Sequence, residues 1–286
     1  MQGKKRGYFL NISFFYAMLR ITVIYNTTRM LLLSTASLTG YGLHRIFQFA
    51  KSAEYTGLDI ALGTLNFDLW DEDYIYDLSK EFNIPVLSLT APGKGMSQKK
   101  LEKIMMIAKK LSVQVVTFSP PHITDKESKW FGAPLAQMKQ LTHLSICVQN
   151  VEPKFLFFLI PEYRNATLTQ IKSVTGDTAL DLLGVDSSSS MDILKAQKIL
   201  GSSVKNIYFS DKYGMRRGIL PGGAGGGISY LPLESFLMKL KASGYGGYVT
   251  LKVNPKEIGV GNAERVLQNL EYMKKYYEKH YKNFNT

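Results

Sequence analysis

The chain has 286 residues, 45% of them hydrophobic and 20% charged, which excludes a disordered protein. Its single cysteine, Cys147, excludes a disulfide framework and is typical of a reducing compartment, so we expect a cytoplasmic protein. Of the net charge of +12, residues 1–29 contribute +5 and the last fifteen residues +3, which leaves +4 for the rest. Because most of the excess lies in the tails, no nucleic-acid partner is expected.

Residues 1–29 are predicted to be an extension outside the folded core. A basic start precedes an apolar run from Tyr8 to Leu19, which resembles a signal peptide. Arg20 interrupts this run, no clean cleavage site follows, and the run is too short to span a bilayer. Met30, or Met18, is the more natural start of the fold. A membrane anchor is the less favoured alternative, and no stable membrane insertion is expected.

From Met30 onward, short apolar runs alternate with amphipathic stretches, a pattern typical of βαβ units and a parallel sheet. The predicted strands, in chain order, are residues 31–36, 58–62, 86–89, 113–118, 146–149, 179–182, 204–209 and 248–253. The predicted helices are residues 43–55, 73–82, 98–111, a segment within 128–141, 168–174, 191–200, 233–242 and 263 to about 281. We expect Ser97 to cap the third helix, and residues 154–165 to be less regular.

Eight strands alternating with eight helices predict an α/β fold, a single (β/α)₈ TIM barrel spanning residues 30–286. An open doubly wound sheet is the alternative. Its first strand-to-helix turn would carry a glycine-rich dinucleotide fingerprint, whereas the turn from Leu38 to Gly42 lacks the third glycine. The barrel is therefore favoured.

Two stretches resemble one family. The run from Asp211 to Gly247 and the segment LHRIFQFAKSAEYTGLDIAL (residues 43–62) are similar to xylose-isomerase-like barrels, the sugar phosphate isomerase/epimerase family. This resemblance implies a site at the C-terminal mouth of the barrel. It also implies a divalent metal held by a Glu ending strand five, an Asp ending strand six, a His on strand seven and a Glu on strand eight.

The positions that the resemblance assigns to metal ligands mostly carry other residues. Gln149 stands at the first Glu position, Tyr208 at the His position and Lys252 at the second Glu position, while Asp181 matches. A His often found three residues after the Asp falls at Gly184. The sequence therefore predicts a degenerate metal site, with no metal and no cofactor.

Lys252 places a cation where the metal charge would otherwise lie. An unpaired buried lysine is costly, so we expect an ion pair with Asp181, or next with Asp211, that replaces the metal electrostatically. Lys252 and Asp181 are the candidate catalytic residues, and Gln149, Tyr208 and Asp211 would bind the substrate. The alternative is that the Lys252 amine extends outward to solvent.

The loop after strand seven is a candidate phosphate site. It contains Arg216, Arg217 and a glycine run that begins with Gly222 and Gly223. Loops at this end of barrels often bind phosphate through backbone N–H groups. A flexible glycine connector is an equally good interpretation.

Three functions follow. The first is a metal-free relative of the sugar isomerases that binds a sugar or sugar phosphate and, if it is an enzyme, acts as an isomerase or epimerase. The second is a non-catalytic binding or scaffold barrel that has lost this chemistry. The least favoured is nucleic-acid processing of the AP-endonuclease type, because the zinc ligands of that branch are absent from the sequence.

Overall fold

The computed structural model describes residues 31–64, 67–125, 128–157, 159–185, 191–222 and 231–282. The predicted extension 1–29 and Gly223 lie outside the described residues. Eight parallel strands close into a barrel in the order β1-β12-β9-β8-β5-β4-β3-β2, which confirms the predicted fold class. The strands are β1 (Leu31–Ser34), β2 (Gly57–Ala61), β3 (Val86–Thr90), β4 (Val115–Phe118), β5 (Ser145–Gln149), β8 (Asp177–Asp181), β9 (Val204–Phe209) and β12 (Tyr248–Leu251).

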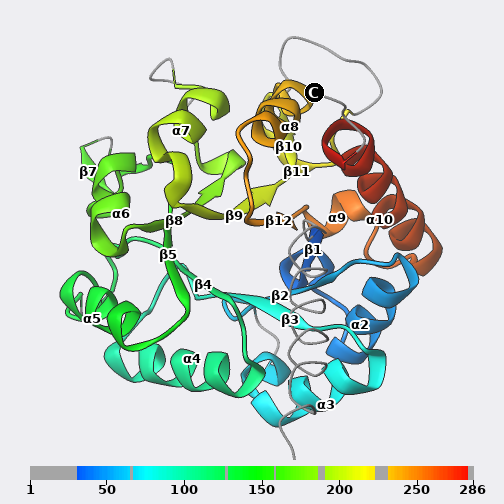
Figure 1. The fold of residues 1–286 in the computed structure, drawn as a ribbon, viewed down its shortest axis with the longest axis horizontal. Helices are drawn as coiled ribbons and strands as arrows, with labels where there is room; N and C mark the ends of the chain where they lie inside the picture. Colours follow the sequence, from blue (N-terminus) through cyan, green and yellow to red (C-terminus); the bar gives the residue numbers. More distant parts are fainter. Residues whose placement is uncertain are drawn as a thin grey trace, which may run out of the picture.

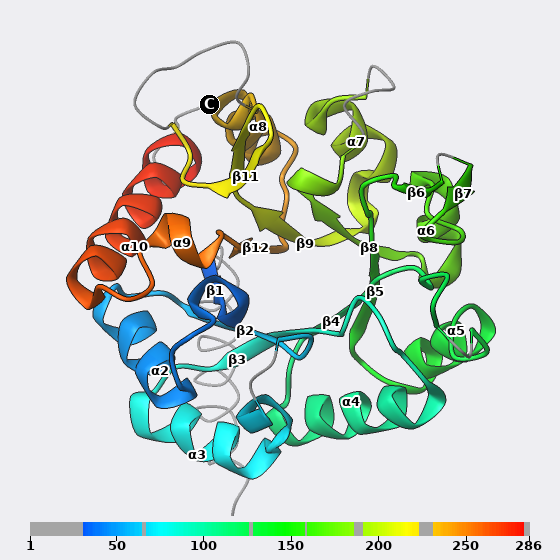
Figure 2. The same cartoon turned by 180° about the vertical axis from the view of Figure 1, so that it is seen from behind.

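Helices surround the barrel on its outer side in both face-on views (Figures 1 and 2). They are α2 (Leu43–Ser52), α3 (Glu72–Phe82), α4 (Gln98–Leu111), α5 (Ala133–Leu141), α6 (Leu168–Thr175), α7 (Ile193–Leu200), α8 (Leu233–Ala242) and α10 (Ala263–Tyr277), with a short α9 (Pro255–Ile258) after β12. Among the described helices, none has both the length and the apolar composition needed to cross a bilayer.

Helix α4 shows why these segments form. Its buried residues recur at spacings of three and four and therefore form one apolar face toward the strands; they are Leu101, Ile104, Ile107 and Ala108. The Ser97 hydroxyl accepts a hydrogen bond from Lys100 N at 3.3 Å, which confirms the predicted N-cap. The bounds of α4 and α8 agree with the prediction residue for residue.

The interior of the barrel is more polar than the layer between strands and helices. Val115, Cys147, Ala179 and Tyr208 form a small apolar cluster inside it. The other buried side chains on the strands include a polar set: Ser34, Asp59, Ser88, Thr90, Thr117, Asn206 and Thr250. Their hydrogen bonds join side chains of neighbouring strands, such as Thr250 Oγ1 to Asn206 Oδ1 at 2.8 Å, and of strands across the interior, such as Asn206 Nδ2 to Ser88 Oγ at 3.4 Å.

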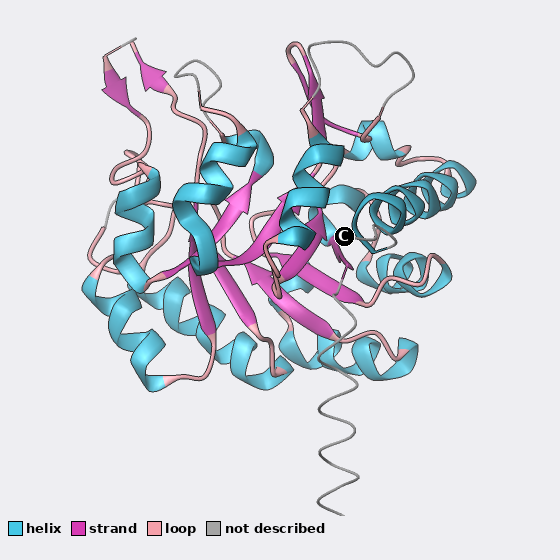
Figure 3. Ribbon diagram, turned by 45° about the horizontal axis from the view of Figure 1, so that its top comes forward, coloured by secondary structure: helices cyan, strands magenta, loops and turns pink. Residues whose placement is uncertain are grey.

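Two hairpins that the sequence did not predict stand at one end of the barrel. They are β6–β7 (Phe155–Leu156 and Ile160–Pro161) and β10–β11 (Asp211–Tyr213 and Arg216–Ile219). Figure 3 shows both projecting from the same end of the barrel. The second hairpin is anchored where Asn254 N donates to Gly218 O at 2.7 Å. Gly218 has a φ of +69° and a Cβ there would lie 3.0 Å from Asn254 N, so this close approach requires glycine.

Candidate functional site

An ion pair occupies the C-terminal mouth of the barrel. Lys252, the residue after β12, places its Nζ 3.0 Å from Oδ2 of Asp181, the last residue of β8. The side chains are 32% and 16% exposed, so the pair faces a cavity without being fully solvated. Lys252 Nζ also lies 4.7 Å from the centre of the Tyr208 ring, a cation–π contact. The outward-pointing alternative for Lys252 is therefore excluded by the structure.

Hydrogen bonds from nearby residues hold Asp181 in place. Its other carboxylate oxygen, Oδ1, accepts a hydrogen bond from Leu183 N at 3.0 Å. The side chain of Asn150 bonds the Asp181 backbone twice, since Nδ2 donates to Asp181 O at 2.9 Å and Oδ1 accepts from Asp181 N at 2.7 Å. A Cβ on Gly184 would lie 2.9 Å from Asn150, so this packing leaves no room for the histidine that the resemblance places there.

Gln149 and Tyr208 are neutral and buried beside the ion pair. The Gln149 amide donates from Nε2 to Ser119 Oγ at 2.7 Å, and within the described residues its Oε1 has no hydrogen-bond partner. The Tyr208 hydroxyl lies 2.6 Å from Thr90 Oγ1. Burial raises the pKa of Tyr208, so the hydroxyl keeps its proton at neutral pH. Because Thr90 Oγ1 donates its own proton to Asp59, Tyr208 is the donor in its bond to Thr90.

Beneath the mouth, a buried carboxylate ends a chain of hydroxyl groups. Asp59 on β2 accepts hydrogen bonds from Thr90 Oγ1 and from Ser34 Oγ, each at 2.8 Å. Burial raises the pKa of Asp59, while the hydroxyl bonds and the charge of Lys252 lower it. The chain from Tyr208 through Thr90 thus connects the ring under Lys252 to Asp59. Asp59 was missed in the sequence, although an acid within the apolar run Leu58–Leu62 is the signal that could have found it.

The ion pair borders a cavity of about 340 Å³ at the mouth. Gln149, Asp181 and Lys252 line it together with Arg217, which the sequence placed in the candidate phosphate loop. The lining also includes residues that the sequence did not assign to the site, among them Asn150, Glu152, Lys154 and Tyr163. Arg217 reaches in from the β10–β11 hairpin, where its guanidinium pairs with Glu152 and donates to Leu183 O. The sequence placed Arg217 in the candidate phosphate loop after strand seven, and the hairpin brings it to this cavity.

Three predicted ligand contacts lie elsewhere. Asp211 is buried, and its Oδ1 accepts backbone hydrogen bonds from Lys212 at 2.8 Å and Leu231 at 3.0 Å. Arg216 pairs with Glu257 at 2.8 Å on the surface, and Gly222 lies near Tyr272 and Tyr276. None of the three is in the lining of the mouth cavity described above, and neither is Tyr208, which is buried under Lys252. Contact of these four residues with a ligand stays a prediction.

The side chains at the mouth do not fit a divalent metal. Carboxylates and neutral imidazoles are the donors that such sites use. Of the four positions that the resemblance assigns, Asp181 alone offers a carboxylate, and an ammonium group occupies the space beside it. Across the described ranges, no group of three or more His, Cys, Asp or Glu side chains could hold a metal ion.

Similar structures define the class of fold. The chain is similar to the crystal structure of D-psicose 3-epimerase with D-tagatose from Clostridium cellulolyticum H10 (TM-score 0.61, 11% identity, covering 88% of this chain and 99% of that one). It is similar to the IolI protein with a bound zinc atom, with a TM-score of 0.63 and 15% identity, covering 88% of this chain and 99% of that one. It is also similar to a xylose isomerase domain protein from Alicyclobacillus acidocaldarius, with a TM-score of 0.62 and 16% identity, covering 87% of this chain and 97% of that one. The fold of the chain is a TIM barrel similar to the folds of these xylose-isomerase-like proteins.

The curated proteins that match the chain in sequence are uncharacterised, and they match over part of their length. No family model matches the chain. An uncharacterised protein of Mycobacterium leprae is 28% identical over 130 residues, which are 42% of this chain and 46% of that protein. An uncharacterised protein of Mycobacterium tuberculosis is 26% identical over the same shares. The chain thus spans about half the length of the curated relatives that it matches.

Proposed function

We propose that this chain is a sugar isomerase/epimerase-like barrel protein that binds a sugar or sugar phosphate at its C-terminal mouth without a catalytic divalent metal. The observation that carries the proposal is the Lys252–Asp181 ion pair, at 3.0 Å on the edge of the mouth cavity. Lys252 supplies a positive charge at the position where a metal ligand is expected, and the adjoining side chains supply hydrogen-bonding groups.

The ammonium group of Lys252 has the donors that this role needs. A lysine carries three N–H donors, and one of them points to Asp181. The others are available to hydroxyl or carbonyl oxygens of a ligand in the cavity. Gln149 Oε1, which has no partner among the described residues, is an acceptor for a ligand hydroxyl. If the protein is an enzyme, Lys252 polarises a carbonyl or condenses with it to an imine and water, and Asp181 is the neighbouring proton acceptor.

Calorimetric titration tests the binding proposal. We expect D-fructose, D-psicose, D-tagatose or their 6-phosphates to bind the wild-type protein. Lys252→Met should weaken binding by roughly 10- to 100-fold, because a lost charge-assisted hydrogen bond costs about 1.5–3 kcal/mol. Lys256→Met, the same change at an exposed site in α9, should leave binding unaltered. Failure of all of these ligands to bind, or stoichiometric divalent metal in purified protein, would refute the proposal.

A non-catalytic binding barrel is the second candidate. The amide of Gln149, fixed on Ser119, stands where a carboxylate that moves a proton is expected, and this favours binding without turnover. Incubation with a bound ketose in D₂O separates the two. Deuterium appearing at the carbon next to the carbonyl, followed by NMR, indicates catalysis, and a bound sugar without exchange indicates a binding protein. Borohydride reduction with the same ketose traps an imine at Lys252 if one forms.

A further inference from the structure

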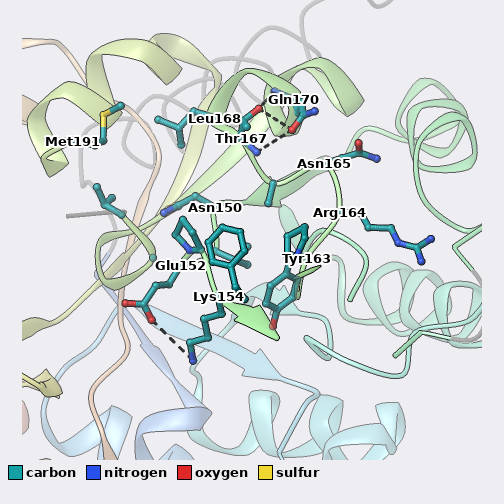
Figure 4. A pocket seen from close by; sticks show the side chains of 17 residues that line it. Asn150, Glu152, Lys154, Tyr163, Arg164, Asn165, Thr167, Leu168, Gln170 and Met191 are labelled. Carbon is teal, nitrogen blue, oxygen red and sulfur yellow. Dashed lines mark hydrogen bonds and ion pairs between the residues drawn. The ribbon is translucent and has the colours of Figure 1, made fainter. Parts of the chain in front are cut away.

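A second cavity, of about 490 Å³, adjoins the mouth. Six residues line both cavities: Asn150, Val151, Glu152, Lys154, Tyr163 and Gly184. The two cavities are therefore neighbouring compartments with a shared polar border, and each has a size typical of small-molecule sites, roughly 300–1,000 Å³. In Figure 4, Met191 and Leu168 lie on one side of the second cavity and Glu152 and Lys154 on the opposite side.

The lining of the second cavity includes an apolar set of side chains. Phe155 and Pro161 from the β6–β7 hairpin line it together with Leu168, Val185 and Met191. Phe155 is 56% exposed, although aromatic side chains usually gain free energy by burial. An apolar wall of this kind, open beside a polar compartment, favours a ligand group that removes both surfaces from water.

Polar side chains in the lining are already engaged with one another. Gln170 N donates to Thr167 Oγ1 at 3.3 Å and Thr167 N donates to Gln170 Oε1 at 3.1 Å, which together form the capping box of α6. The Thr167 hydroxyl also donates to Gln170 Oε1, at 2.8 Å. Glu152 pairs with Arg217 and with Lys154. Figure 4 shows the Arg164 side chain extending away from Glu152 and Lys154. The second cavity therefore offers a ligand mainly apolar contact.

We infer that the ligand of this protein is amphipathic: a hydroxylated carbonyl compound of the sugar class that carries an apolar substituent. Its polar end lies at Lys252 and Asp181, and its apolar group crosses the border of Asn150 and Glu152 and packs against Phe155 and Met191. This inference rests on the proposed function, because the polar end occupies the site described above. It narrows the ligand class to sugar-like compounds with an apolar group. An unmodified hexose lacks such a group and leaves the apolar compartment empty.

The test compares matched ligands and matched variants. D-Fructose, D-psicose and D-tagatose are titrated alongside their 6-O-benzyl ethers, which leave the hydroxyketone end free. We expect at least one benzyl ether to bind about tenfold or more tighter than its parent sugar, as burial of a ring predicts. Phe155→Ser should weaken binding of the benzyl ether about 5- to 10-fold and leave the parent sugar unaffected. Phe157→Ser is the control, because Phe157 belongs to the same hairpin, is 86% exposed and is not in the cavity lining.

Three results would overturn the inference. If parent sugars bind in a Lys252-dependent manner and the benzyl ethers bind no tighter, the amphipathic ligand is refuted and the proposed function stands. If neither set binds, both are refuted. If Phe155→Ser and Phe157→Ser act equally and shift a dimer to a monomer in sedimentation, the hairpin is a contact between copies of the chain, and the apolar compartment is not a ligand site.

Discussion

The Lys252–Asp181 pair makes a quantitative prediction about stability. Lys252→Met removes the ammonium and keeps much of the apolar stem, while Asp181→Asn removes the carboxylate charge and keeps an oxygen for Leu183 N, which now bonds Asp181 Oδ1 at 3.0 Å. Neither change creates a large void. A double-mutant cycle of these two substitutions isolates the energy of the ion pair. The contact of Lys252 with Tyr208 is lost both in Lys252→Met and in the double variant, so it cancels in the cycle.

The expected size follows from distance and exposure. Two unit charges 3.0 Å apart attract by about 5 kcal/mol at the effective dielectric constant of roughly 20 that suits protein sites. Desolvation and side-chain ordering offset most of this. Exposed pairs contribute about 0.2–1 kcal/mol, and breaking a fully buried pair costs about 3–5 kcal/mol. Because Lys252 is 32% exposed and Asp181 16%, we expect a coupling energy of about 1–2 kcal/mol.

Urea unfolding of the wild type, both single variants and the double variant measures this coupling. Each single variant should be less stable than the wild type, and the double variant should lose less than the sum of the two. Added salt should reduce the coupling only slightly, because a partly buried pair is poorly screened. Additive losses, within about 0.3 kcal/mol, would show that the two charges do not interact in solution and would remove the basis of the proposed function.

Two further predictions concern groups beneath and beside the pair. Between the ordinary carboxyl pKa of 3.8 and the raised pKa of Asp59, the unfolded chain has lost its proton while the folded protein keeps it, so stability falls as pH rises through this window. Asp59→Asn lacks this dependence and should gain stability relative to wild type as pH rises, measured by urea unfolding; parallel pH profiles would contradict this. Gly184→Ala should lower the free energy of unfolding by about 1–3 kcal/mol, because its Cβ would clash with Asn150. Gly246→Ala is the control, because its Cβ would meet open space; equal melting temperatures of the two variants would refute the prediction.

The barrel was predictable from sequence because its elements repeat a strong local pattern. In α4 the apolar residues follow the helical period and Ser97 supplies a cap, so the bounds could be found without tertiary information. The β10–β11 hairpin was not predicted. Its strands of three and four residues flank Gly214 in the polar segment DKYGMRR, and packing against Asn254 stabilises them more than any local propensity.

The ion pair was predictable and the cavity was not. The resemblance assigned Asp181 and Lys252 to the mouth and implied that the lysine points inward, and the carboxyl ends of β8 and β12 bring the two side chains to that mouth. The cavity also depends on Arg217, on Tyr163 and on the fixed amide of Asn150, each positioned by a loop or hairpin. Loop positions are set by long-range contacts, and one sequence carries no pattern that reports them.

Charge balance links the four positions at the mouth into one unit. The family resemblance implies three carboxylates there, offset by a divalent cation, and without that cation the carboxylates would repel one another in a partly buried site. In this chain Gln149 and Tyr208 are uncharged and Lys252 neutralises Asp181, so these four side chains carry no net charge. The same ammonium favours the ionised form of Asp59 below it. The four residues are electrostatically consistent only as a set. Lys252 beside a full set of metal ligands would repel the metal, and Gln149 and Tyr208 without Lys252 would leave Asp181 unpaired in a poorly solvated site.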